Sequence, residues 1–401
     1  MNEVIIMFLN RITKRASTVL LSGLLGVAVS VSAVPMPTTS AMGIGDIVGI
    51  GVGVAQVTQQ KEMLTKQYKY INTTEEGREM LFQEFRKNQG VNDDPELNGK
   101  LDIIMGRLSE AVAEVDPTIK NLPYKYFINM DKSLNASCAM GHVMTVNTGT
   151  FYHLANDDEI AAVVGHEMGH GQKDHVFKSL TSRFDKELLA SIGVALASGS
   201  NTGALLGNIV GNLALKHSIV HADKRHEWEA DGMAFEYITH TDYNPGACAA
   251  VMQRFIDLMG TQKQSTGEML FNPSDHPNSE ARRDKYVKQL GEYSGNHVTA
   301  KNGTVFVNGN AFVTPAPAAG MSAMERSYFV FGNLAAAYHN HHSSNSAYVE
   351  NGTVMLGPQA IFTPTGQDES ADVLAERLNS IKDLKADSGN KKNDKKDKNA
   401  K

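Results

Sequence analysis

The sequence predicts an α+β protein: a mainly helical domain with a small edge-strand sheet, followed by a small C-terminal α+β domain of two repeats. Three observations predict this class. Apolar residues recur at helical spacing over 95–115 and 157–170. Short strand-like runs at 124–130 and 141–147 lie between those helices. Finally, the segment 302–315 recurs at 351–364 with half of its positions identical.

Composition limits the class of protein. The chain has 401 residues, of which 41% are hydrophobic and 20% charged, as in ordinary folded proteins. Its net charge of −6 argues against nucleic acid as a partner. Two cysteines, Cys138 and Cys248, make no disulfide framework. One bridge between them and two free buried thiols both remain open.

The N-terminus is typical of an export signal. Arg11, Lys14 and Arg15 precede an uncharged run, and small residues at 31–33 offer a cleavage site, so we expect a signal peptide over 1–33. The alternative is an uncleaved anchor, which would hold the protein on a membrane. A Gly-rich lead-in follows at 34–60. We then expect the main domain at 61–295, the repeats at 300–385 and a disordered Lys-rich tail at 386–401.

Local signals place the helices and strands in order. A capping box at 73–76 starts a helix that runs to about Lys87, and Asp94-Pro95 starts a second with one clean apolar face. A strand at 124–130 precedes a second one at 141–147, whose exposed edge we expect to pair with an extended substrate backbone. Asn156 then caps a helix with three acidic residues in its first turn.

That last helix carries a metal-binding pattern, His166-Glu167-Met168-Gly169-His170. Residues four apart lie on one helical face, so the two imidazoles can bind one divalent ion. Glu167 lies beside that face, where its carboxylate can take a proton from water at the metal. The pattern therefore predicts metal-assisted hydrolysis.

A third ligand must come from elsewhere. In one known pattern the third ligand is a His six residues after the second His of the motif, but that position holds Val176 here. Glu187 lies near another known ligand spacing but has Ser191 where a carboxylate is needed. Glu227 and Asp231 are better candidates because they are four apart on a helical segment. Glu227 can be the third zinc ligand, and Asp231 can fix the tautomer of a ligating His.

These motifs resemble the HtpX-like and CAAX-prenyl-endopeptidase-like gluzincin metallopeptidases, especially their soluble envelope (BepA-like) branch. The resemblance rests on His166–His170 and on Glu227-Trp228-Glu229-Ala230-Asp231, and it covers roughly residues 60 to 290. It implies a zincin-like fold with one Zn²⁺ per chain. The family pattern puts the ligand at Glu227, not at Glu229.

Two looser matches add further residues. His276-Pro277 followed by Arg282 matches a motif whose His lies over the zinc in relatives, so the resemblance implies catalytic or regulatory roles for His276 and Arg282. The segment 135–141 corresponds to the hairpin that leads into the active-site edge strand. We therefore expect protein or peptide substrates to bind along Gly141 to Asn147.

The sequence thus predicts an exported zinc metalloendopeptidase, periplasmic or otherwise in the cell envelope or outside the cell. Glu167 would be its general base. The rival hypothesis is a chaperone-like or scaffolding envelope protein whose zinc site is plugged and rarely active. Each C-terminal repeat is expected to form a hairpin followed by a helix, at 322–338 and 370–384. The partner of these repeats is unknown, and a purely stabilising role is equally favoured.

Overall fold

The structure is a computed structural model that describes residues 68–179, 224–262 and 279–384, with a few neighbouring positions (62, 65, 66, 181, 182 and 185). The chain divides into two compact units. In the described part of residues 1–77 and 174–223, the rings of Tyr68 and Phe177 stack with centroids 3.8 Å apart. The other unit comprises residues 78–173 together with those from 224 onward, and it holds the candidate site.

Several predictions fall outside the described residues. These are the export signal or anchor at 1–33, the lead-in at 34–60, His276 and the tail at 386–401. Among the helices that the described residues form, none is both long enough and apolar enough to span a bilayer.

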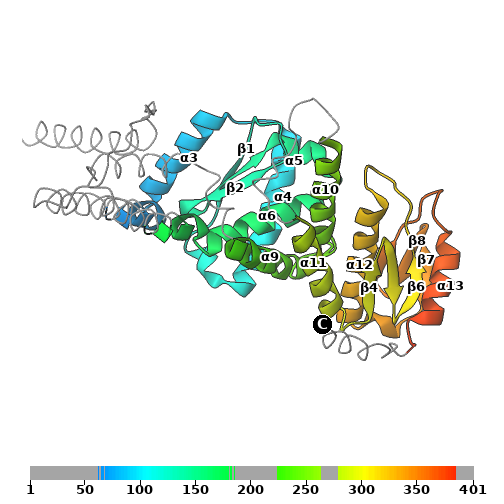
Figure 1. Ribbon diagram of the computed structural model, residues 1–401. Helices are drawn as coiled ribbons and strands as arrows, with labels where there is room; N and C mark the ends of the chain where they lie inside the picture. Colours follow the sequence, from blue (N-terminus) through cyan, green and yellow to red (C-terminus); the bar gives the residue numbers. More distant parts are fainter. Residues whose placement is uncertain are drawn as a thin grey trace, which may run out of the picture. The chain divides into compact units, whose positions relative to one another are not determined.

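A three-stranded sheet lies beside the metal-motif helix (Figure 1). It contains β1 (Lys125–Asn129), β2 (Ala136–Ala139) and β3 (Val143–Asn147) in the order β1-β3-β2. β1 pairs parallel to β3, and β2 pairs antiparallel to it on the other side. All five residues of β3 are buried.

The prediction of an exposed edge strand at Gly141 to Asn147 is therefore wrong. Met140–His142 form a short 3₁₀ turn, with Gly141 at a φ of 72°, and β3 is the central strand of the sheet. The edge nearest the metal motif is β2, which packs on the helix α6 (Asp157–Gln172). The parallel pair β1–β3 joins one segment that precedes β2 in the sequence with one that follows it. The local sequence pattern carries no signal for such a pairing.

The helices around the sheet begin where the sequence signals put them. α3 covers Glu75–Gln89, and α4 covers Pro95–Val115 with Asp94 as its N-cap. In α6, the Asn156 side chain accepts a hydrogen bond from Glu159 N at 3.0 Å. Shorter helices are η1 (Pro117–Lys120) and α5 (Thr148–His153). The Asp94 and Asn156 side chains accept hydrogen bonds from backbone N–H groups that α4 and α6 cannot pair internally.

Two later helices approach α6 and complete the site. α9 (Lys224–Thr239) packs along α6, and α10 (Ala247–Gln262) packs on both α6 and α11 (Ser279–Tyr293). A Cβ added to Gly169 would lie only 3.1 Å from the Ala230 backbone. Because Gly169 has no side chain, α9 comes close enough to α6 to bring Glu227 within reach of the two imidazoles.

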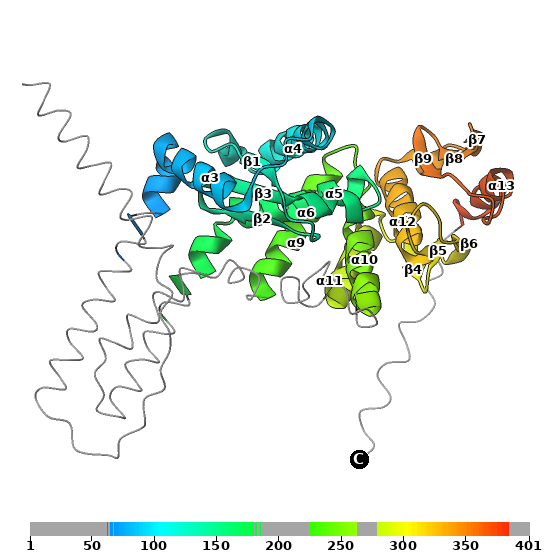
Figure 2. The same ribbon diagram turned by 90° about the horizontal axis from the view of Figure 1, so that it is seen from above.

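Each C-terminal repeat forms an antiparallel three-stranded sheet and a helix (Figure 2). The first contains β4 (Val298–Lys301), β5 (Thr304–Val307), β6 (Asn310–Val313) and α12 (Ala323–His339). The second contains β7 (Ala347–Glu350), β8 (Thr353–Leu356), β9 (Gln359–Phe362) and α13 (Ala371–Ile381), while η4 (His342–Ser344) lies between the two. The predicted hairpins are present, but each copy has one more strand at its start. That strand was missed because 298–301 and 347–350 share no identical residue.

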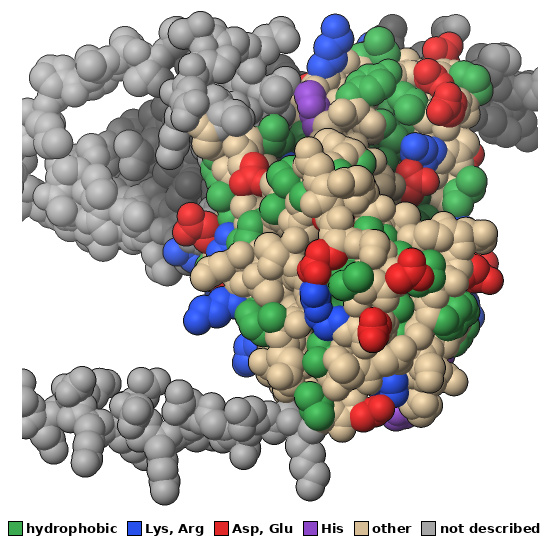
Figure 3. All heavy atoms as spheres, turned by 90° about the vertical axis from the view of Figure 1, so that its right-hand side faces the viewer, with side chains coloured by type: hydrophobic (Ala, Val, Ile, Leu, Met, Phe, Trp, Pro, Cys, Tyr) green, Lys and Arg blue, Asp and Glu red, His purple; other side chains and the backbone are tan. Residues whose placement is uncertain are grey.

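The two repeats pack reciprocally. α12 packs on β4 and β5 of its own copy and on β9 of the other, whereas α13 packs on β7 and β8 of its own copy and on β6 of the other. Each copy turns from its first to its second strand at an Asn-Gly pair with positive φ at both residues, which suits a tight hairpin. On the face drawn in Figure 3, acidic and basic side chains of the described residues are interspersed with hydrophobic ones.

The repeats also share a core with the helices that surround the site. α12 packs on α10 and α11, and a Cβ at Gly332 would overlap the backbone of Gly246. Beside this contact, Arg254 of α10 lies between two buried carboxylates, those of Glu159 in α6 and Glu325 in α12. The domain boundary between 295 and 300 stays a prediction.

Candidate metal centre

Two imidazoles from α6 form the base of the candidate metal centre. His166 and His170 are both buried, and their Nε2 atoms are 3.1 Å apart. The spacing of four residues produces this pairing, because it puts both side chains on the face of α6 that α9 covers. Glu167 is buried next to them. Ligand atoms of His166, Glu167 and His170 all lie within 4.8 Å of one another.

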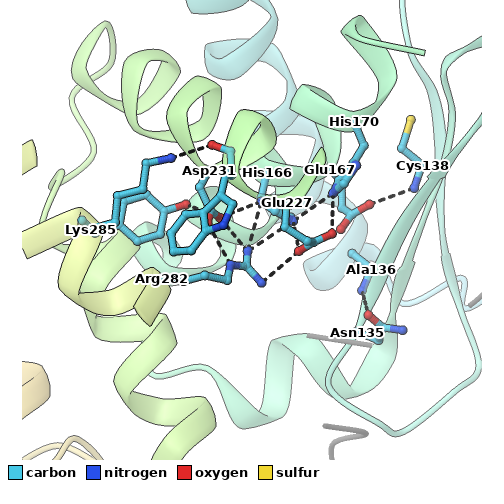
Figure 4. Close-up of polar contacts among 12 residues, drawn as sticks. Asn135, Ala136, Cys138, His166, Glu167, His170, Glu227, Asp231, Arg282 and Lys285 are labelled. Carbon is cyan, nitrogen blue, oxygen red and sulfur yellow. Dashed lines mark hydrogen bonds and ion pairs between the residues drawn. The ribbon is translucent and has the colours of Figure 1, made fainter. Parts of the chain in front are cut away.

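The carboxylate of Glu227 comes from α9 and faces the same point (Figure 4). Its Oε2 lies 3.5 Å from His166 Nε2, and its Oε1 lies 3.3 Å from His170 Nε2. Ligand atoms around a tetrahedral zinc ion with bonds of 2.0–2.1 Å are about 3.3 Å from one another. The Nε2–Nε2 separation of 3.1 Å is close to that value, and so are the distances of 3.5 and 3.3 Å from the two nitrogens to the two different oxygens of the Glu227 carboxylate. Two imidazole nitrogens and a carboxylate therefore fit one small divalent cation.

A second group of side chains surrounds these three. Asp231, one turn after Glu227, has its Oδ1 3.1 Å from His166 Nδ1. This contact orients the ring so that Nε2 faces the other two residues. Arg282 of α11 donates to Asp231 from Nε at 2.8 Å and from Nη2 at 2.6 Å, and its Nη1 lies 3.1 Å from Glu227 Oε2. Tyr286 Oη donates to Asp231 Oδ1 at 2.8 Å.

The charges in this buried cluster shift the pKa values of its members. Burial and the charge of Arg282 lower the pKa of His166, but hydrogen bonds to Asp231 and Glu227 outweigh them and raise it to about 9. Burial raises the pKa of Asp231, yet Arg282 and His166 lower it well below its ordinary value. Burial lowers the pKa of Arg282, whereas Asp231 and Glu227 raise it overall. The carboxylates therefore attract positive charge to His166, and a proton competes with a metal ion there.

Glu167 is held by the neighbouring sheet. The backbone N–H of Cys138 in β2 donates to Glu167 Oε2 at 3.0 Å. Earlier on the same edge, the N–H of Ala136 donates to the Asn135 side chain at 3.0 Å. Figure 4 shows both contacts on the side of the strand that faces the cluster. The edge of β2 thus lies beside the carboxylate and orients it.

Lys285 and Trp228 fix the start of α9 from outside the cluster. Lys285 Nζ donates to Trp228 O at 2.6 Å and lies 5.0 Å from the centre of the indole ring. Trp228 follows Glu227 directly, so this contact helps to hold Glu227 in place. Burial lowers the pKa of Lys285.

The structure brings together His166, Glu167, His170, Glu227, Asp231 and Arg282. Arg282 contacts Asp231 and Glu227, which is the geometry of a positioning residue; its predicted catalytic role stays a prediction. The sequence interpretation missed Tyr286 and the N–H of Cys138. Tyr286 lies four residues after Arg282 and so on the same face of α11, a signal that was available. A backbone N–H leaves no signal in the sequence.

Comparison with known proteins agrees with this geometry. Residues 98–289 match peptidase family M48. The chain is 28% identical over 183 residues to the metalloprotease LoiP of Escherichia coli, covering 45% of this chain and 68% of LoiP. It is 24% identical over 179 residues to a putative beta-barrel assembly-enhancing protease of Vibrio cholerae, covering 43% of this chain and 35% of that relative. The mitochondrial metalloendopeptidase OMA1 of Arabidopsis thaliana is 22% identical over 171 residues, which cover 32% of its length.

The match to family M48 contains every residue of the polar cluster, from Cys138 in β2 to Tyr286 in α11. The relatives named as a metalloprotease and a metalloendopeptidase align over 45% and 43% of this chain. The part of the chain that carries the candidate site is therefore similar to peptidase family M48.

Proposed function

We propose that this protein is an exported zinc metalloendopeptidase. The observation that carries the proposal is the set of three separations among His166 Nε2, His170 Nε2 and the Glu227 carboxylate, which match the spacing of ligands around one tetrahedral ion. Three protein ligands leave one position for water or substrate, and that is the arrangement of catalytic rather than structural zinc sites.

Each residue then has a role that its contacts support. Zinc, when bound, polarises a water molecule and the scissile carbonyl group. Glu167, with one oxygen fixed by Cys138 N–H, accepts the proton that water loses and passes it to the leaving amine. Asp231 fixes the His166 tautomer, and Arg282 fixes the positions of the Asp231 and Glu227 carboxylates by pairing with both. His276, outside the described residues, keeps its proposed role as plug or catalytic group.

Substrate is proposed to bind as an additional strand on β2. Among the described strands, β2 is an outer strand of its sheet, and its edge away from β3 runs past Glu167. Main-chain pairing binds an extended peptide with little dependence on its sequence. A location in the periplasm, elsewhere in the envelope or outside the cell is proposed from the N-terminal signal. The beta-barrel assembly-enhancing proteases among the relatives support a role in protein assembly or quality control.

Metal analysis combined with one proteolysis assay tests the proposal. Purified protein should contain one zinc per chain, and it should cleave casein in a manner that a chelator abolishes. Glu167→Gln should keep zinc and lose cleavage, because only the proton acceptor is removed. Glu227→Gln should lose both. Glu229→Gln, which alters an exposed carboxylate of the same helix turn, is the matched control and should keep both.

Two outcomes would contradict the proposal. Full zinc content in Glu227→Gln would remove Glu227 from the ligand set. Suppressed aggregation of an unfolded client with no chelator-sensitive cleavage would favour the chaperone-like alternative instead.

A further inference from the structure

A small apolar pocket opens beside the metal cluster, on the side of α10 and α11. His166 and Glu167 line one end of it. The rest of its described wall comes from helices of the same compact unit: Ala162 and Val163 in α6, Cys248, Val251, Met252 and Phe255 in α10, and Arg282 and Tyr286 in α11. Because His166 and Glu167 are also the groups at the proposed reaction centre, whatever fills this pocket lies next to the reacting bond.

The polar atoms in the wall are already engaged. Tyr286 Oη donates to Asp231, and Arg282 is paired with Asp231 and Glu227. Burial raises the pKa of the Cys248 thiol, so it stays neutral and behaves as a small apolar group. Apart from the metal cluster itself, the described wall therefore presents no charge for a ligand, and a charged side chain would be desolvated there without compensation.

The pocket is also small. It encloses about 20 Å³, which is room for roughly one water molecule or one methyl group. A leucine or phenylalanine side chain would have to displace part of the wall. Met252 is the wall residue most able to move because its chain is unbranched, but it is buried among well-packed neighbours.

We propose that this pocket receives the side chain of the residue next to the scissile bond and that it selects a small apolar side chain such as alanine. Met252 sets the size limit. The inference rests on the proposed peptidase function and adds a substrate class to it. One methylene more or less in such a pocket changes kcat/KM by about 10- to 200-fold.

The test changes the depth of the pocket. Bonds that the full-length protein cleaves in a peptide mixture are identified by mass spectrometry, and each flanking residue is then varied among Ala, Val, Leu and Phe. We expect wild type to prefer Ala over Phe at one flank by at least about tenfold. Met252→Ala should reduce that ratio at least about tenfold. Met259→Ala, the same change on the same helix outside the pocket, should leave the ratio unchanged.

A second readout does not need hydrolysis. The affinity of fluorescent Ala and Phe peptides for the zinc-loaded Glu167→Gln variant is measured by anisotropy. The Ala peptide should bind more tightly than the Phe peptide. Adding Met252→Ala should weaken or reverse that preference. An Ala-to-Phe ratio that Met252→Ala leaves unaltered, or a wild type that prefers Leu or Phe, would overturn the pocket assignment. A wild type without chelator-sensitive cleavage would instead contradict the peptidase function, while the binding order would still decide the pocket.

Discussion

Arg254 is the residue whose replacement should reveal how firmly the repeats are joined to the metal-motif helix. Its Nε lies 3.2 Å from Glu159 Oε1 in α6 and 3.0 Å from Glu325 Oε1 in α12. Its Nη1 donates to Gly320 O at 3.2 Å. The side chains of Glu159 and Glu325 are 0% and 3% exposed, so one buried cation serves two buried carboxylates. In Arg254→Met these two carboxylates lose their only cation among the described contacts.

The expected loss follows from what a buried carboxylate can do without a partner. Removing one member of a buried ion pair destabilises a protein by about 3–5 kcal/mol. Each carboxyl can avoid the buried charge by taking a proton. From an ordinary pKa of 4.5, keeping a proton at pH 7 takes about 3.4 kcal/mol per group at 1.36 kcal/mol per pH unit. At pH 5 the same step takes only about 0.7 kcal/mol.

The sign of the pH dependence is fixed by the direction of the shifts. Burial raises the pKa of both Glu159 and Glu325 even with Arg254 present. A raised pKa in the folded state means that the associated stability is present below pH 4.5 and is lost as pH rises through the folded value. The variant should raise both pKa values further. Its destabilisation should therefore be about 3–5 kcal/mol at pH 7 and at least about 2 kcal/mol smaller at pH 5.

Urea unfolding of the full chain, followed by circular dichroism at pH 7 and pH 5, measures this effect. Lys288→Met is the control, because the Lys288–Glu292 pair has side chains 77% and 58% exposed and should contribute less than about 1 kcal/mol at either pH. The reasoning would be refuted if Arg254→Met were within about 1 kcal/mol of wild type at pH 7, or equally destabilised at both pH values. Arg254→Lys, which keeps the charge, should be intermediate if the methionine variant does not fold.

Two further predictions concern the repeats and the metal site. Hydrogen bonds from Thr365 and Ala316 and contact with Arg326 lower the pKa of Asp368 to about 2 despite burial. Its contribution, about 2 kcal/mol, should therefore be present above pH 3.8 and disappear as pH falls toward 2. Asp368→Asn should thus lower the free energy of unfolding by about 2 kcal/mol at pH 6 and by only about half as much at pH 3. Equal losses at both pH values would argue against an ionised Asp368. Tyr286→Phe removes a hydrogen bond to Asp231 and should weaken zinc affinity about tenfold in competition with a chromophoric chelator. Tyr293→Phe, on the same helix, should leave zinc affinity unchanged. Identical zinc affinities for the two variants would show that Tyr286 does not support the metal site.

The parts of the structure that could be predicted from the sequence depend on local signals. The α4 and α6 helices begin directly after their N-caps, Asp94 and Asn156, because caps and first-turn charges act within a few residues. That His166 and Glu227 lie close together could be predicted only because each belongs to a motif with a known spacing of residues. Neither helix caps nor apolar periodicity could show that β3 is the central strand. β2 lies between β1 and β3 in the sequence, yet β1 pairs directly with β3 in the sheet.

Tertiary contacts between distant segments were the least accessible. Arg254, Glu159 and Glu325 come from three helices, and none of their sequence neighbours indicates that they meet. The same holds for the pocket wall, where apolar residues of α10 look like ordinary core positions until α6 and α11 are placed beside them. Gly169 was part of a recognised motif, but its effect on helix separation required the position of Ala230.

The reciprocal packing of the two repeats has a consequence for their origin. Each helix completes its hydrophobic contacts on a strand that belongs to the other copy. A polypeptide with a single copy would leave that strand and that helix face uncovered, and a second identical molecule would supply both missing surfaces through a two-fold axis. Gene duplication would then have turned an association between two chains into a permanent one within a single chain, free of any dependence on concentration.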